Sequence, residues 1–154
     1  MGNPSSNAPH HRDLVFGPEA DGAFRKGLAC VRQALADWQL TAPHDDALLI
    51  AAELLSNAVK HAGGPTRLSI DHVAGHLRIA VTDPSPTPLH RAHRRPDEDG
   101  GRGIFLIDQL AAHWGTRPEE VGKTIWADLP VSAGETGSGR RSRCACWRRT
   151  ASAT

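Results

Sequence analysis

Glu53 and Asn57 lie four positions apart in the segment ELLSNAVKHA. On an α-helix this spacing places both side chains on one face, one turn apart. An amide oxygen suits Mg²⁺, a hard cation that takes few protein ligands and keeps its water and phosphate ligands. A carboxylate one turn away could orient or deprotonate an attacking hydroxyl group. Taken alone, the pair equally fits a solvated polar face, so its meaning depends on the rest of the chain.

Two other segments carry groups suited to a nucleotide. Asp83 ends an alternating segment, where its carboxylate could accept a hydrogen bond from an amine such as that of adenine, although an Asp before Pro84 also commonly forms a turn. Residues 100–103 read Gly-Gly-Arg-Gly and precede an apolar segment with helical spacing. Free N–H groups at a helix N-terminus bind phosphate, and glycines permit close backbone approach. Such a segment is common in loops, and it lacks the Lys-Ser/Thr of a Walker motif.

Hydrophobic periodicity predicts the elements that would position these residues. Apolar steps of three and four predict helices, alternation predicts strands, and Ala74-Gly75 predicts a tight hairpin. Their order favours an α+β fold, a two-layer sandwich in which a mostly antiparallel mixed sheet carries helices on one face. The predicted helices span about 19–38, 43–62 and 104–112, and the predicted strands span 14–16, 67–73, 76–82, 113–116 and 123–129.

The same periodicity predicts which helix faces are buried. In the first helix the predicted core stripe includes Phe24 and Leu28, and in the second it includes Leu48, Leu55 and Val59. On this assignment the face that carries the glutamate and asparagine of ELLSNAVKHA is turned about a quarter-circle from the core.

The 154 residues suffice for one domain, predicted at 13–131 between a disordered leader, 1–12, and a disordered Arg-rich tail, 132–154. A net charge of +1 points to no particular partner, and the tail has too few aromatic residues to favour direct nucleic-acid binding. Without an apolar run long enough for a bilayer or a signal peptide, no membrane association is expected. Three cysteines make a poor disulfide framework, which favours a cytoplasmic setting.

In combination these segments resemble the Bergerat-fold ATPases, the superfamily of DNA gyrase, histidine kinases and the MutL repair proteins. More narrowly, the chain is similar to the small anti-sigma factor serine kinases. ELLSNAVKHA resembles the N box of that family, Asp83 the aspartate that opens the first glycine box, GGRGIFLID the second glycine box, and GKTIWADLP the closing strand. The resemblance covers roughly residues 14–130.

The resemblance implies ATP and Mg²⁺ as cofactors and a role for each matching residue. The segment 84–100 would be the ATP lid. The first glycine box departs from the family, because prolines follow the aspartate and cannot donate N–H groups or adopt positive φ. The implied roles are general base for Glu53, Mg²⁺ ligand for Asn57, adenine-amine acceptor for Asp83, phosphate contacts for Gly101, Arg102 and Gly103, and support of the adenine pocket for Thr124.

The resemblance further implies a serine/threonine protein kinase that acts by partner switching, binding a sigma factor and phosphorylating a small antagonist protein, and it allows a homodimer. The alternative is a non-catalytic module of the same fold that sequesters a protein partner, which the proline-rich first glycine box favours. A histidine-kinase fragment is disfavoured because no helix with a phosphoacceptor histidine precedes the domain. His90 and His93 have no obvious third ligand, so a structural metal is not expected.

Overall fold

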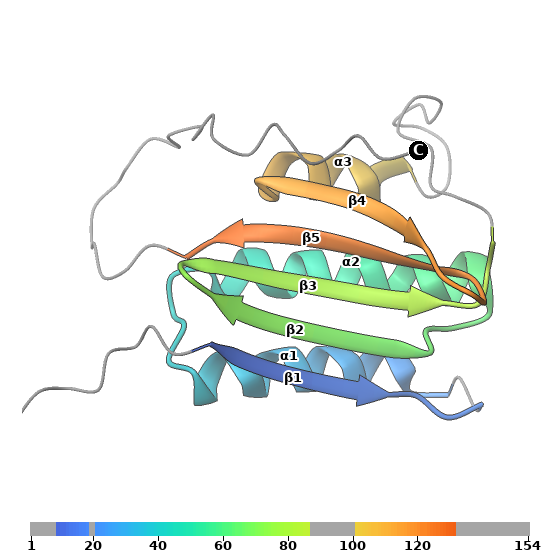
Figure 1. Ribbon diagram of the computed structural model, residues 1–154, viewed down its shortest axis with the longest axis horizontal. Helices are drawn as coiled ribbons and strands as arrows, with labels where there is room; N and C mark the ends of the chain where they lie inside the picture. The colour runs from blue at the N-terminus through green and yellow to red at the C-terminus, as the bar shows by residue number, and fades with distance from the viewer. Residues whose placement is uncertain (1–8, 19–20, 87–100, 132–154) are drawn as a thin grey trace, which may run out of the picture.

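The computed structural model describes residues 9–18, 21–86 and 101–131. Five strands form one sheet in the order β1-β2-β3-β5-β4, and all four neighbouring pairs are antiparallel. In the described part of the chain three helices accompany the sheet, and their arrangement in Figure 1 confirms the predicted α+β sandwich. The elements are β1 (His10–Val15), α1 (Ala23–Asp37), α2 (His44–Ala62), β2 (Arg67–Val73), β3 (His76–Asp83), α3 (Gly101–Leu110), β4 (His113–Pro118) and β5 (Lys123–Pro130).

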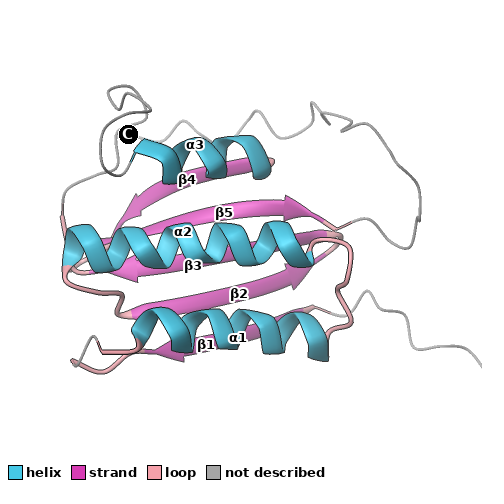
Figure 2. Ribbon diagram, turned by 180° about the vertical axis from the view of Figure 1, so that it is seen from behind, coloured by secondary structure: helices cyan, strands magenta, loops and turns pink. Residues whose placement is uncertain are grey.

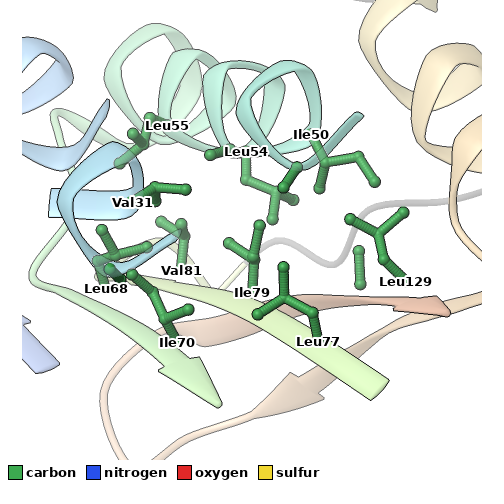
Figure 3. Packing of buried hydrophobic residues seen from close by; sticks show 14 of the residues in the cluster. Val31, Ile50, Leu54, Leu55, Leu68, Ile70, Leu77, Ile79, Val81 and Leu129 are labelled. Atoms are coloured by element: carbon green, nitrogen blue, oxygen red, sulfur yellow. The ribbon is translucent and has the colours of Figure 1, made fainter. Parts of the chain in front are cut away.

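The helices all lie on one face of the sheet, with α2 between α1 and α3 (Figure 2). Apolar side chains of α1 and α2 meet those of the central strands in a single core (Figure 3). Strand side chains alternate between faces, so every second residue of β2 and β3 enters this core. The fully buried residues include Val31, Ile50, Leu54, Leu55, Leu68, Ile70, Leu77, Ile79, Val81 and Leu129.

Local sequence signals set the ends of several elements as predicted. Ala74 and Gly75 both have positive φ, 49° and 78°, as a two-residue hairpin loop between twisted strands requires. Gly63 ends α2 in the left-handed conformation, at φ 74°. Asp45 and Asp46 lie in the first turn of α2, where they meet the positive end of the helix dipole.

Three sequence expectations require correction. The first strand begins at His10, so residues 10–12 of the predicted leader pair with β2. Phe24 and Val59, predicted in the core, are 38% and 43% exposed. The spacing of apolar residues gave the wrong buried face for α2 because residues 47–52 are all apolar, so several faces look equally hydrophobic. In the structure α2 packs on the sheet and on both neighbouring helices. Its buried residues are Ala47, Ile50, Ala51, Leu54, Leu55, Asn57 and Ala58.

The sheet face away from the helices carries a polar network. The guanidinium of Arg78 donates to both oxygens of Asp128 across β3 and β5, at 2.6 and 2.7 Å. The same guanidinium lies 4.3 Å from the ring centroid of Trp126. These contacts tie β3 to β5 near the N-terminal end of β3 and the C-terminal end of β5. Among the described residues, no helix is long and apolar enough to cross a membrane.

Candidate functional site

Three of the segments singled out in the sequence lie toward the same end of the molecule. The C-terminal end of β3, the C-terminal half of α2 and the N-terminal end of α3 all point to this end (Figures 1 and 2). Helix α2 packs against both β3 and α3. The fold therefore places the N-box segment, the strand-end aspartate and the start of the Gly-rich helix in one region.

Asn57 is the buried polar residue of α2, 6% exposed. Its amide nitrogen, Nδ2, is buried and has no hydrogen-bond partner among the described residues. Glu53 lies one turn earlier and is partly buried, and the described part of the chain gives its carboxylate no hydrogen bond or ion pair. A buried polar atom is normally satisfied, so the absence of a partner for the Asn57 nitrogen within the described residues is unusual.

Asp83 is 2% exposed, and its carboxylate is engaged within the fold. Its Oδ1 accepts a hydrogen bond from the ammonium group of Lys123 at 3.0 Å and another from the backbone N–H of Ser85 at 2.9 Å. The side chain shares the helix-side face of β3 with Val81, two residues earlier. Asp83 is therefore both a strand-end acceptor and a turn former, the two interpretations that its sequence context suggests.

Sequence reasoning missed Lys123, the ion-pair partner of Asp83. Lys123 and Asp83 are direct partners in the register of β3 and β5. One signal was present in the sequence, since Lys123 has the same alternation as Ile125 and Ala127, which face the core. A lysine at a strand position whose side chain points toward the core requires a buried hydrogen-bond acceptor, and Asp83 is that acceptor.

The hydroxyl of Thr124 is not brought together with Asp83. Its Oγ1 lies 2.7 Å from Thr82 Oγ1 and donates to Glu119 at 2.7 Å. Adjacent strand residues point to opposite faces, so Thr124 lies on the face away from the helices. The hydrogen bond from Thr124, and then that from Arg117, holds the pKa of Glu119 below its usual value.

Gly101 begins α3, so Gly101, Arg102 and Gly103 form its first turn, as a phosphate-binding helix N-terminus requires. The side chains of residues 101–104 lie outside the described part of the structure, as do residues 87–100, which include most of the predicted lid. His90 and His93 fall in the same range, outside the described residues.

The described residues contain no cluster of three or more His, Cys, Asp or Glu side chains that could hold a metal. Mg²⁺ bound with phosphate does not need such a cluster, because it retains water and phosphate oxygens among its ligands. The side chain of Asn57 fits this requirement, since its amide oxygen is of the kind that ligates a hard cation, and its amide nitrogen, which has no partner among the described residues, can donate to a phosphate oxygen.

Comparison with known proteins agrees with this arrangement. Residues 19–129 match the model of the histidine kinase-like ATPase domain family, and such a domain implies ATP binding. Among curated proteins, an uncharacterized protein of Streptomyces coelicolor is 34% identical over 68 residues, which span 41% of this chain and 65% of that protein. The name of this relative states no activity.

Among solved structures, the chain is similar to the RsbU and RsbW domains of Rv1364c from Mycobacterium tuberculosis. The TM-score is 0.55 at 18% identity, and the match covers 80% of this chain but 32% of that one. At this identity the similarity establishes the fold. The chain spans about two thirds of the length of its curated relative and about one third of this structural neighbour.

Proposed function

Because the chain belongs to the histidine kinase-like ATPase domain family, we propose that it binds ATP with Mg²⁺ and acts as a serine/threonine protein kinase in partner switching. The observation that carries the proposal is the buried amide nitrogen of Asn57, which lies one helical turn from the carboxylate of Glu53; neither group has a partner among the described residues. The similarity to a structure that contains an RsbW domain supports the anti-sigma factor kinases as the group within this family.

In this proposal each residue acts through binding or proton transfer. Asn57 would hold the metal through its amide oxygen, and the N–H groups in the first turn of α3 would donate to phosphate oxygens. Glu53 accepts the proton of the attacking serine or threonine hydroxyl. When bound, Mg²⁺ neutralises charge on the transferred phosphoryl group. Catalysis would thus rest on positioning and electrostatics.

The proposed partners are a sigma factor, which the chain would bind, and a small antagonist protein, which it would phosphorylate. We propose a cytoplasmic location for this exchange. A homodimer stays a prediction from the family resemblance.

A specific observation favours the second candidate, a non-catalytic module that sequesters a protein partner. The carboxylate of Asp83, which would accept the adenine amine, is already paired with Lys123. Pro84 and Pro86 follow Asp83, where the family carries glycines. Both features would weaken adenine recognition while leaving the fold unchanged.

A labelling experiment separates the two candidates. Extract of the source organism, from a strain without this chain, is supplied with γ-labelled ATP and either the wild-type protein or Glu53→Gln. We expect label on serine or threonine with wild type and roughly a hundredfold slower labelling with Glu53→Gln, the usual contribution of a general base. Glu120→Gln, at an exposed glutamate between β4 and β5, is the matched control and should label like wild type. Binding of ATP without any labelling by wild type would establish the non-catalytic module.

A further inference from the structure

Lys123 and Asp83 form a buried ion pair at the base of the candidate site. The ammonium nitrogen lies 3.0 Å from Asp83 Oδ1 and 3.3 Å from the carbonyl oxygen of Ser85. The two side chains are 7% and 2% exposed. An ammonium group buried in this way is stable because the carboxylate balances its charge and two oxygens accept hydrogen bonds from its N–H groups.

The backbone holds this pair in place. Strands β3 and β5 pair in a register that puts Asp83 directly opposite Lys123. Gly122, at φ 84°, brings the preceding turn so close that a Cβ there would lie 1.9 Å from the carbonyl oxygen of Asp83. A side chain at position 122 would separate the strand end from the turn. The close approach therefore depends on a glycine at that position.

The pair has a direct consequence for nucleobase recognition. In the carboxylate that would accept an adenine amine, Oδ1 already accepts two hydrogen bonds, one from a full positive charge, and the described residues place none on Oδ2. A charge-assisted bond of this kind is about twice as strong as a neutral one, and an adenine amine is a neutral donor. With Asp83 only 2% exposed, a base cannot reach its carboxylate unless the surroundings of the pair rearrange.

We propose that Lys123 is an internal competitor of the nucleobase: in the free protein its ammonium group pairs with Oδ1 of Asp83 and neutralises the carboxylate, which weakens the hydrogen bond that Asp83 can accept from an adenine amine. This inference rests on the proposed function, since it concerns the base-binding end of the same site. It makes Lys123 a residue that lowers both the affinity for ATP and the selectivity for adenine over 6-oxopurines.

The test compares wild type with Lys123→Met by calorimetric titration of Mg-ATP and of Mg-inosine triphosphate, whose base carries an oxygen in place of the amine. Lys123→Met frees the carboxylate, so it should bind ATP on the order of tenfold more tightly than wild type, the size of one net hydrogen bond to a charged group. Inosine triphosphate should gain little. Lys26→Met, at an exposed lysine of α1, is the matched control and should bind both nucleotides like wild type.

Removing one partner of a buried ion pair can unfold a protein, so a second variant supports the test. Lys123→Gln retains a neutral donor for Asp83 and should show a smaller gain for ATP, roughly threefold, in the same direction.

The outcomes separate the inference from the proposed function. Wild-type ATP affinity in a folded Lys123→Met, or in Lys123→Gln where the Met variant does not fold, overturns the competitor role and leaves ATP binding intact. An equal gain for ATP and inosine triphosphate also overturns it, because the amine would then be irrelevant. Failure of wild type and variants to bind either nucleotide at millimolar concentration overturns both proposals.

Discussion

Asn57 and Asp83 are both buried polar residues at the same end of the molecule, yet the fold hydrogen-bonds only the Asp83 carboxylate and leaves the Asn57 amide nitrogen without a described partner. A buried amide without a partner lowers stability. A protein that retains one is expected to use it for a ligand. The structure therefore supports a ligand contact more strongly for Asn57 than for Asp83. The role of Asp83 depends on whether its ion pair with Lys123 persists when a nucleotide binds.

Replacing Asn57 should separate stability from ligand binding. Asn57→Leu removes the unsatisfied amide and adds apolar contacts in a buried position, so we expect the free energy of unfolding without nucleotide to rise by about 1 kcal/mol. Thr124→Val provides the contrast, because it removes a buried hydroxyl with two partners. That variant should lose about 1–2 kcal/mol. Urea denaturation measures both, and a large loss in Asn57→Leu would mean that the fold itself uses the amide.

Gly122 should be far less tolerant of alanine than Gly63. Both have positive φ, 84° and 74°, so each substitution carries backbone strain of about 1–2 kcal/mol. A Cβ at Gly122 would also lie 1.9 Å from the Asp83 carbonyl oxygen, whereas a Cβ at Gly63 has nothing within 4 Å. We expect Gly122→Ala to cost at least about 2 kcal/mol more than Gly63→Ala in urea denaturation. Equal losses of unfolding free energy in the two variants would show that the turn before β5 can shift away from the Asp83 carbonyl without a penalty.

His72 should make the protein sensitive to mild acid. Its side chain is buried, its Nδ1 has no partner among the described residues, and its ring stacks on that of His10 at 5.9 Å between centroids. Burial first, and then the charge of His10, lower the pKa of His72 from its ordinary 6.5. The unfolded chain therefore binds the proton first as the pH falls below about 6.5, and stability is lost from there down to the folded-state pKa.

The corresponding experiment compares wild type with His72→Phe at pH 7.5 and 5.5. Wild type should lose more unfolding free energy between these values than the variant, with a slope of at most about 1.4 kcal/mol per pH unit for one proton. Hydrogen bonds to Asp71 and then Asp13 raise the pKa of His11, so its contribution has the opposite sign and is lost as the pH rises through that pKa. Identical pH dependence in the two proteins would contradict the assignment to His72.

Signals confined to neighbouring residues made much of the fold predictable. Positive-φ residues at Ala74 and Gly75 define the hairpin, and Gly63 ends α2, so the sequence located both. The strand order was not predictable in this way, because β5 lies between β3 and β4 only through pairing that no local pattern encodes. The buried face of α2 was also misassigned, since a helix that is apolar on several sides gives the period little contrast.

The same distinction between local sequence signals and long-range strand pairing applies to the candidate site. The spacing of Glu53 and Asn57 is a local property of one helix, and the structure preserves it. The partner of Asp83 depends on the register of β3 against β5, forty residues apart, and so Lys123 emerged only from the structure. Register also puts the hydroxyl of Thr124 on the far face of the sheet, which the motif alone does not indicate.

Calorimetric titration of Mg-ATP into the wild-type protein and into Asn57→Ala tests the central claim most directly. The account predicts saturable binding to wild type and affinity at least about tenfold lower in Asn57→Ala, the loss expected when one contact to a charged ligand is removed. Saturable binding of equal affinity in the two proteins would contradict the assigned role of Asn57. No binding to folded wild type at millimolar ATP would contradict the nucleotide site as a whole and leave the partner-binding module as the function of this fold.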